Sequence, residues 1–373
     1  MAEAALRSSL PPPPPAPAPI EVQWLGCDLV TGRIVEELPA LSPSGAISRR
    51  IGAHASAGFS LALPDAPEGW ESATDPGRTM IVALADDEPV WAGMVLTRKG
   101  GSSETAELGC ATPEAYFDRR FTRDHSWTQR DEASVIAAGL IGDTQIDGIG
   151  LTVDAPPTGV LRDREYADAD DATVLSRLQD LMAVVGGPEF TVDVRWRAGT
   201  TRVELVARVR PRIGVQTDRP SAVFTFPGDV VDYTLHESYE NGKGANVVRA
   251  RGEGEGEDRY TSRDMVATDL LAAGWPRYEH RFTPSTSITS QDVLDGHAMS
   301  ALDIMRAGAR VWELTANAIE APRLGRDWGL GDTVALDVIS SPRHPNGASV
   351  TARAWGWQWD TRADRITPII AED

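Results

Sequence analysis

The chain has 373 residues, of which 41% are hydrophobic, so it is long enough for two or three folded domains. It carries 55 acidic and 36 basic side chains, a formal charge of −19, which argues against broad binding of nucleic-acid phosphates or of an anionic membrane. No stretch approaches the roughly 18 apolar residues of a membrane-spanning helix, and two cysteines exclude a disulfide framework or a multi-thiolate zinc site.

A proline-rich arm is predicted for residues 1–19, which include the tract LPPPPPAPAP. Proline has no amide donor and a fixed φ, so this tract favours neither helix nor sheet. The composition is typical of a disordered leader, and the alternative is an arm that lies on a neighbouring subunit. Because the segment lacks an apolar core, we expect no signal peptide.

Short strands separated by turns are predicted between residue 20 and about residue 110. The segments are IEVQWLGCDLV, RIVEEL, SAGFSLALP, TMIVALA, PVWAGMVLTRKG and TAELGC. Strands at this spacing favour a small barrel or sandwich, so we expect a first β domain over residues 20–125.

Helices are concentrated in the middle of the sequence. Thr112-Pro113-Glu114 has the composition of a helix start, a second helix is predicted over 131–141, and a third over about 171–185. In the third, one apolar stripe is formed by Val174, Leu178, Leu181 and Val185. FTVDVRW and TRVELVARVR then predict a hairpin. We expect a helical plus hairpin domain over 126–215.

The last part of the sequence, residues 216–373, returns to strands. Helices are expected at 263–273, capped by Ser262, and at about 291–307, within a helical insertion at about 261–310. VWELTANAI, DTVALDVISS, SVTARAWGWQWD and DRITPII are all strand-like. The fold class predicted is therefore α+β, mainly β. A β-rich start, a helical middle and a β-rich end agree with two β-barrel-like domains that carry inserted α/β segments.

Motifs for catalysis are lacking. The six histidines form no HExxH or HxH spacing, and neither GxSxG nor GxxxxGK[ST] occurs. Cys27 and Cys110 are expected to be buried structural thiols. The acidic residues Asp168, Asp170 and Asp171 are interpreted as helix-end charges, and the loop GEGEGED at 252–258 lacks the ligand order of a calcium loop. We expect no enzyme activity, no cofactor and no metal site.

Three tryptophans recur at every second residue in AWGWQWD: Trp355, Trp357 and Trp359. On a regular strand all three point to one face. An exposed face of this kind would suit a sugar, whereas a buried one would lie in a core or subunit contact. We favour the buried alternative.

Three stretches resemble the minor tail proteins that form the tail hub in long-tailed phages of actinobacteria. In PVWAGMVLTRKG and AELGCATPEAYFDRR, the matching residues are Trp91, Gly93, Val95, Tyr116, Phe117 and Arg120. The second stretch is GGPEFTVDVRW with RVRPRIG at 208–214, and the third is VWELTANAI, LGDTVALDV with Gly331-Asp332, and DRITPII. In this order the resemblance covers residues 20–373.

This resemblance implies a structural role in the virion, at the tail tip, after assembly in the host cytoplasm. Hub proteins form a homotrimer that closes the distal end of the tail tube, and two barrel-like hub domains per chain make a six-fold-like ring. The implied partners are the distal tail and other tail-tip proteins and the tape-measure protein, with DNA passing nearby but not specifically bound and no membrane insertion by this chain. Since the sequence ends at Asp373, we expect this chain to lack the peptidase or lysozyme extension that some hubs carry.

Two other functions are kept as alternatives. A receptor- or glycan-binding tail protein is motivated by the tryptophans, and a virion-associated cell-wall hydrolase by the many carboxylates. For the hub, we expect a central opening whose wall is acidic or neutral, because arginine contacts would retard DNA. The acidic stretches 163–171 and 252–258 are candidates for surfaces near that path.

Overall fold

The computed structural model describes residues 20–184, 186–284 and 288–371. Strands account for 44% of the residues and helices for 18%, which confirms a mainly β fold of the α+β class. The predicted arm at 1–19 lies outside the described residues, as does Val185. Within the described ranges, no helix is both long and apolar enough to cross a membrane.

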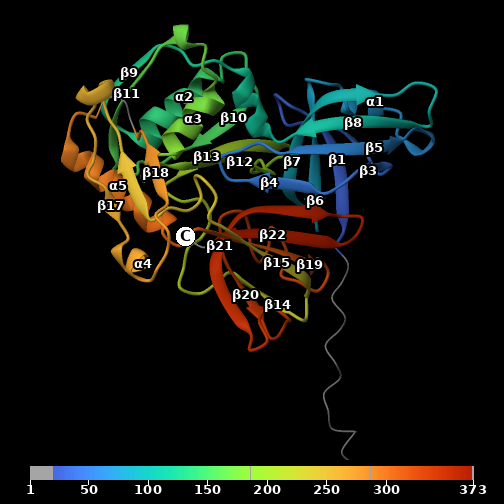
Figure 1. Ribbon diagram of the computed structural model, residues 1–373. Helices are drawn as coiled ribbons and strands as arrows, with labels where there is room; N and C mark the ends of the chain where they lie inside the picture. Colours follow the sequence, from blue (N-terminus) through green and yellow to red (C-terminus); the bar gives the residue numbers. More distant parts are fainter. Residues whose placement is uncertain (1–19, 185, 285–287, 372–373) are drawn as a thin grey trace, which may run out of the picture.

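The first sheet has seven strands in the order β2-β1-β6-β7-β8-β5-β3, and all its neighbouring pairs are antiparallel. All of the strands except β3, which was not predicted, lie close to the predicted segments, and the sheet curls into a half-barrel at the right of Figure 1. Their bounds are Val22–Asp28 (β1), Ile34–Glu37 (β2), Leu41–Pro43 (β3), Ser56–Ala62 (β5), Thr79–Ala85 (β6), Glu88–Lys99 (β7) and Thr105–Ala111 (β8). A short helix, α1 (Trp70–Ala73), precedes β6.

Both faces of the sheet are buried along the central parts of β1, β6 and β7, which explains the nearly unbroken apolar runs in these strands. In β6, Ile81 and Ala83 belong to the core shared with the C-terminal sheet, whereas Met80 and Val82 face a second core under the helices. In β7, the indole of Trp91 lies over Gly93, where a Cβ would collide with the ring. The W-x-G spacing thus places the aromatic ring and the residue without a side chain on one face.

The middle segment packs helices over this second core. It contains a two-stranded ribbon, β9 (His125–Asp131) with β11 (Leu161–Tyr166), and a sheet of β10 (Leu151–Asp154), β13 (Val203–Arg210) and β12 (Glu189–Trp196). The predicted hairpin is confirmed, since β12 pairs antiparallel with β13. The parallel pairing of β10 with β13 was not predicted.

Helix starts in this segment differ from the sequence prediction. Pro113–Arg119 is a 3₁₀ helix, and the Thr112 hydroxyl accepts from the Ala55 amide at 3.0 Å instead of capping it. Asp131 does cap, but the turn it opens is a π-helical one, Glu132–Ala137, that continues as α2 (Ala138–Asp143).

The third predicted helix starts later than expected. Asp171 has a left-handed φ of 50°, so α3 (Val174–Met182) begins only after Thr173, whose hydroxyl caps the Ser176 amide. The carboxylates of 168–171 precede this helix, as expected, but they do not cap it.

The C-terminal sheet is ordered β14-β20-β21-β22-β19-β15, and β4 (Ile47–Arg50) from the N-terminal half pairs with β21. Figure 1 shows this sheet below the first one. Its strands are Ala222–Phe226 (β14), Val230–Ser238 (β15), Ala309–Asn317 (β19), Thr333–Val338 (β20), Ala348–Asp360 (β21) and Arg365–Ala371 (β22). One hydrophobic core joins both large sheets.

A small lobe is inserted between β15 and β19. It holds the sheet β17-β16-β18 and two helices, α4 (Thr268–Ala272) and α5 (Gln291–Met305), and α5 agrees with the prediction. The strands are Val247–Ala250 (β16), Met265–Val266 (β17) and Glu279–Phe282 (β18). The helix predicted over 263–273 is wrong in its first turn, because Met265 and Val266 pair with β16 and the Ser262 hydroxyl bonds the Ala250 amide at 2.9 Å.

Candidate functional site

The strand of tryptophans runs through the junction of the two large sheets. Trp357 and Trp359 are buried in the shared core, with 1% and 3% of their surface exposed. The register of β21 against β22 shifts between Ala354 and Gly356, so Trp355 stands at a bulge. Trp355 is half-buried, and the guanidinium of Arg353 lies 4.6 Å from the centre of its ring.

Strand β4 joins the two halves of the chain at this point. Arg49 pairs with Trp357 in the ladder, and a Cβ on Gly356 would lie only 2.9 Å from the Arg49 carbonyl oxygen. From the first sheet, the Trp91 indole donates to the Ser48 carbonyl at 3.1 Å. The two sheets are therefore joined by backbone pairing as well as by the core.

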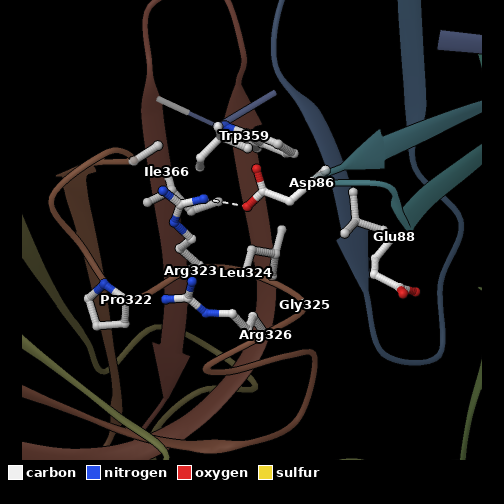
Figure 2. A pocket seen from close by; sticks show the side chains of 13 residues that line it. Asp86, Glu88, Pro322, Arg323, Leu324, Gly325, Arg326, Trp359 and Ile366 are labelled. Atoms are coloured by element: carbon white, nitrogen blue, oxygen red, sulfur yellow. Dashed lines mark hydrogen bonds and ion pairs between the residues drawn. The ribbon is translucent and has the colours of Figure 1, made fainter. Parts of the chain in front are cut away.

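A cavity of about 150 Å³ lies at the edge of this junction. Figure 2 shows its walls: the β6–β7 turn with Asp86 on one side, and the loop Pro322–Arg326 with Trp359 and Ile366 on the other. Asp86 and Asp87 both have positive φ, as a two-residue hairpin turn requires. The Arg323 guanidinium forms an ion pair with Asp86 across the opening. This geometry ties the sheets together and holds no nucleophile with a neighbouring base.

A buried ion pair connects the middle segment to the C-terminal sheet. Arg353 on β21 donates to both carboxylate oxygens of Glu189 on β12, at 2.8 and 2.6 Å, and to the Ile213 carbonyl at 3.0 Å. The same carboxylate accepts from the Ile213 amide at 2.7 Å. The two side chains are only 4% and 5% exposed, so they act as one neutralised unit within the interior.

A second charged link joins β4 to β12. Arg49 donates to Thr191 Oγ1, the Val192 carbonyl and Asp193 Oδ1, at 2.8, 2.9 and 2.7 Å. Burial by itself would raise the pKa of Asp193, but the guanidinium groups of Arg49 and Arg208 hold that pKa below its ordinary value. Asp193 therefore stays ionised in the folded protein.

Arginines gather along a groove beside this link. The cavity has a volume of about 420 Å³, and its arginines are Arg49, Arg195, Arg208, Arg210 and Arg212. Each has a carboxylate partner, such as Glu204 for Arg195 at 2.7 Å and Asp154 for Arg210 at 2.6 Å. The groove is thus an ion network in which these five arginines share four carboxylates, those of Asp154, Glu189, Asp193 and Glu204.

Groups with catalytic potential are dispersed. Cys27 and Cys110 are free and buried, as expected, and burial raises the pKa of each thiol to about 12. Within the described ranges, no group of three or more His, Cys, Asp or Glu side chains has a geometry that could hold a metal ion. His125 lies against Asp143 at 2.8 Å and stacks on Trp127, but in the described part of the chain no serine, threonine or cysteine side chain is hydrogen-bonded to its ring.

Two residues on which the sequence resemblance was based, Arg120 and Asp332, have structural roles in this fold. Arg120 donates to the carbonyls of Thr144 and Ile146 at 3.0 and 2.8 Å and to the Tyr116 hydroxyl, so it closes the C-terminal end of α2. Asp332 follows Gly331, which has a φ of 85°, and its carboxylate accepts from the amides of Gly329 and Val215. The sequence analysis did not identify Glu189, Arg353 and Arg49 as partners in ion pairs, because no local pattern indicates a pairing between residues so far apart in the chain.

Comparison with known proteins shows which solved structures have a similar fold. No protein-family model matches the sequence, and no curated protein matches it. Among solved structures, the tail protein of Neisseria meningitidis MC58 matches at 14% identity with a TM-score of 0.59, covering 95% of this chain and 97% of that one.

Two further structures match over nearly the same extent. The prophage tail protein gp18 of Listeria monocytogenes EGD-e matches at 11% identity with a TM-score of 0.56, over 95% of this chain and 94% of that one. The 43 kDa tail protein of prophage MuSo2 from Shewanella oneidensis has the same identity and TM-score, over 94% and 97%. The chain has the fold of these phage tail proteins.

Proposed function

We propose that this chain is a structural tail hub protein of a phage virion, which closes the distal end of the tail tube and connects it to tail-tip proteins. The observation that carries the proposal is the likeness in fold to phage tail proteins over 94–95% of the chain. The resemblance of the β7–β8 hairpin and of the terminal strands to actinobacteriophage hubs supports the narrower assignment.

The assembly proposed is a homotrimeric ring. Each chain contributes two seven-stranded sheets, and three chains would therefore present six similar units to a six-fold tail tube. In this division the hub domains are residues 20–125 and 216–373, with 126–215 and about 261–310 as additions at their margins. The buried links of Glu189 and Arg49 support a rigid subunit, since both fix β12 of the middle segment to the C-terminal sheet.

No catalysis is part of this function. Pure protein incubated with host peptidoglycan is expected to release no soluble fragments. Release that a single carboxylate substitution abolishes would favour the cell-wall hydrolase. The proposed partners are the distal tail protein, other tail-tip proteins and the tape-measure protein, with DNA passing through the opening without specific contacts.

The assembly test is direct. The mass of the purified protein in solution and averaged electron-microscope images are expected to give three copies in a three-fold ring. A stable monomer that binds cell-wall glycan would instead favour a receptor-binding tail protein.

A further inference from the structure

Three aromatic side chains of the inserted lobe form a cluster, the aromatic patch: the half-buried Tyr239 and the exposed Trp275 and Tyr278. Their rings lie 5.3 Å (Tyr239 to Trp275) and 5.1 Å (Tyr239 to Tyr278) apart. Trp275 and Tyr278 are 43% and 46% exposed, which is high for large aromatic residues. The patch therefore offers apolar ring surface to a partner.

The central ring is held in place by two glycines. A Cβ on Gly244 would collide with the Tyr239 ring, and one on Gly308 would lie 3.0 Å from it. Gly308 also has a φ of 73°, which a larger side chain would adopt only with strain. The ring is thus pre-positioned, so binding costs little side-chain entropy.

The two exposed side chains of the aromatic patch, Trp275 and Tyr278, have hydrogen-bond donors that no protein acceptor among the described residues uses. In the described part of the chain, the Tyr239 hydroxyl is buried and has no hydrogen-bond partner. Among the same residues, neither the Trp275 indole N–H nor the Tyr278 hydroxyl donates a hydrogen bond to a protein acceptor. Because the Tyr239 hydroxyl is enclosed, the donors open to a ligand are those of Trp275 and Tyr278. A ligand that fits must therefore supply acceptors and apolar rings.

A proline tract has this complementary chemistry, and this chain contains one, LPPPPPAPAP at residues 10–19. Proline has a carbonyl acceptor and no amide donor, and proline runs favour a polyproline II helix that docks on exposed tryptophan and tyrosine rings. We propose that the aromatic patch binds the proline tract of a neighbouring copy of this chain.

The position of the tract's attachment favours a neighbour over the same copy. Residue 19 adjoins Ile20, which lines the cavity at the junction of the sheets, so the tract has no linker with which to cross the molecule. Figure 1 shows β1 and α4 on opposite sides of the subunit. In a cyclic ring, one side of each copy contacts the opposite side of the next copy. This arrangement brings the proline tract of one copy next to the aromatic patch of its neighbour. This step rests on the proposed ring.

Photo-crosslinking of the full chain tests the contact between copies. Benzoylphenylalanine is placed at Trp275 in a copy whose Pro11–Pro15 are replaced by serine, and this copy is co-expressed with the unmodified chain. Illumination is expected to give a covalent dimer whose cross-linked peptide contains residues 10–19. The matched control places the photo-crosslinker at Tyr260, which lies in the same lobe, is 46% exposed and has no ring contact in the described structure. Equal dimer at both positions, or none at Trp275, overturns the proposal.

A binding assay separates this proposal from the ring itself. A fluorescent peptide of residues 8–20 is titrated, by anisotropy, against the chain with Pro11–Pro15 replaced by serine. The peptide is expected to bind, Trp275→Ala to weaken binding by at least about ten-fold, and Tyr260→Ala to leave it unchanged. If the peptide does not bind, or if it binds the Trp275→Ala and Tyr260→Ala variants with equal affinity, the aromatic patch is not its binding site, whether or not the ring forms.

Discussion

Replacing Arg353 by methionine tests the buried link between the middle segment and the C-terminal sheet. The change removes four hydrogen bonds, three of 2.6–3.0 Å and one of 3.4 Å to the Gly331 carbonyl. It leaves Glu189 with the Ile213 amide and with Arg212, whose nearest nitrogen is 3.5 Å away. A buried carboxylate that loses its charged partner costs about 3–5 kcal/mol of unfolding free energy. The assay is urea-induced unfolding followed by tryptophan fluorescence.

A double-mutant cycle makes this prediction specific. Replacing Glu189 and Arg353 together by methionine is expected to cost less than the sum of the two single changes by at least about 2 kcal/mol, because the double variant leaves no buried charge. The matched control is Lys99→Met, which removes an exposed pair with Glu107 at 3.9 Å and is expected to cost about 1 kcal/mol or less. The reasoning would be refuted if the free-energy losses of the two single variants add up to that of the double variant. It would also be refuted if Arg353→Met costs no more unfolding free energy than Lys99→Met.

Four further outcomes are expected. Trp357→Ala lowers the unfolding free energy by about 3–5 kcal/mol, because it empties a fully buried site, whereas Trp275→Ala costs about 1 kcal/mol or less; similar losses would contradict the burial argument. Partial burial by itself would raise the pKa of Asp131. The hydrogen bonds that its carboxylate accepts from the backbone amides of the turn it caps outweigh this effect and lower the pKa from 3.8 to about 2. Since the folded-state pKa is depressed, its contribution is complete above about pH 4 and is lost as the pH falls toward 2; the stability difference between wild type and Asp131→Asn should shrink over that window, and a constant difference would exclude the charge effect. A thiol reagent should label neither Cys27 nor Cys110 in the native protein and both after unfolding, and native labelling would place a thiol at the surface. The assembled protein should not retain duplex DNA in a filter-binding assay at physiological salt, and tight binding would contradict an acidic or neutral opening.

Local patterns in the sequence were sufficient for most strands and for the fold class. A strand that is buried on both faces of a sheet needs apolar residues at successive positions. TMIVALA and PVWAGMVLTRKG have this composition, and both segments form strands close to the predicted bounds. The capping residues were less predictable, because Thr112 and Ser262 satisfy distant backbone amides instead of the helix that follows each of them. Capping composition identifies a polar residue near a helix start, but not the partner that its hydroxyl finally reaches.

Long-range pairing was beyond the sequence patterns. ISRR forms β4 only because β21 lies beside it, more than 300 residues later, and nothing in those four residues indicates that edge. Glu189 and Arg353 are 164 residues apart and look like ordinary surface charges. The regular spacing of the tryptophans likewise could not indicate the bulge at Trp355. In each case tertiary structure, not local preference, decides the outcome.

The central claim is that three copies of this chain form a ring. The most direct measurement is light scattering of the purified full chain combined with class averages from electron microscopy. The account predicts a particle of three times the 40.2 kDa chain mass, with a central opening and six similar lobes around a three-fold axis. A particle that stays at one chain mass at micromolar concentration, or a closed two-fold dimer, would contradict it.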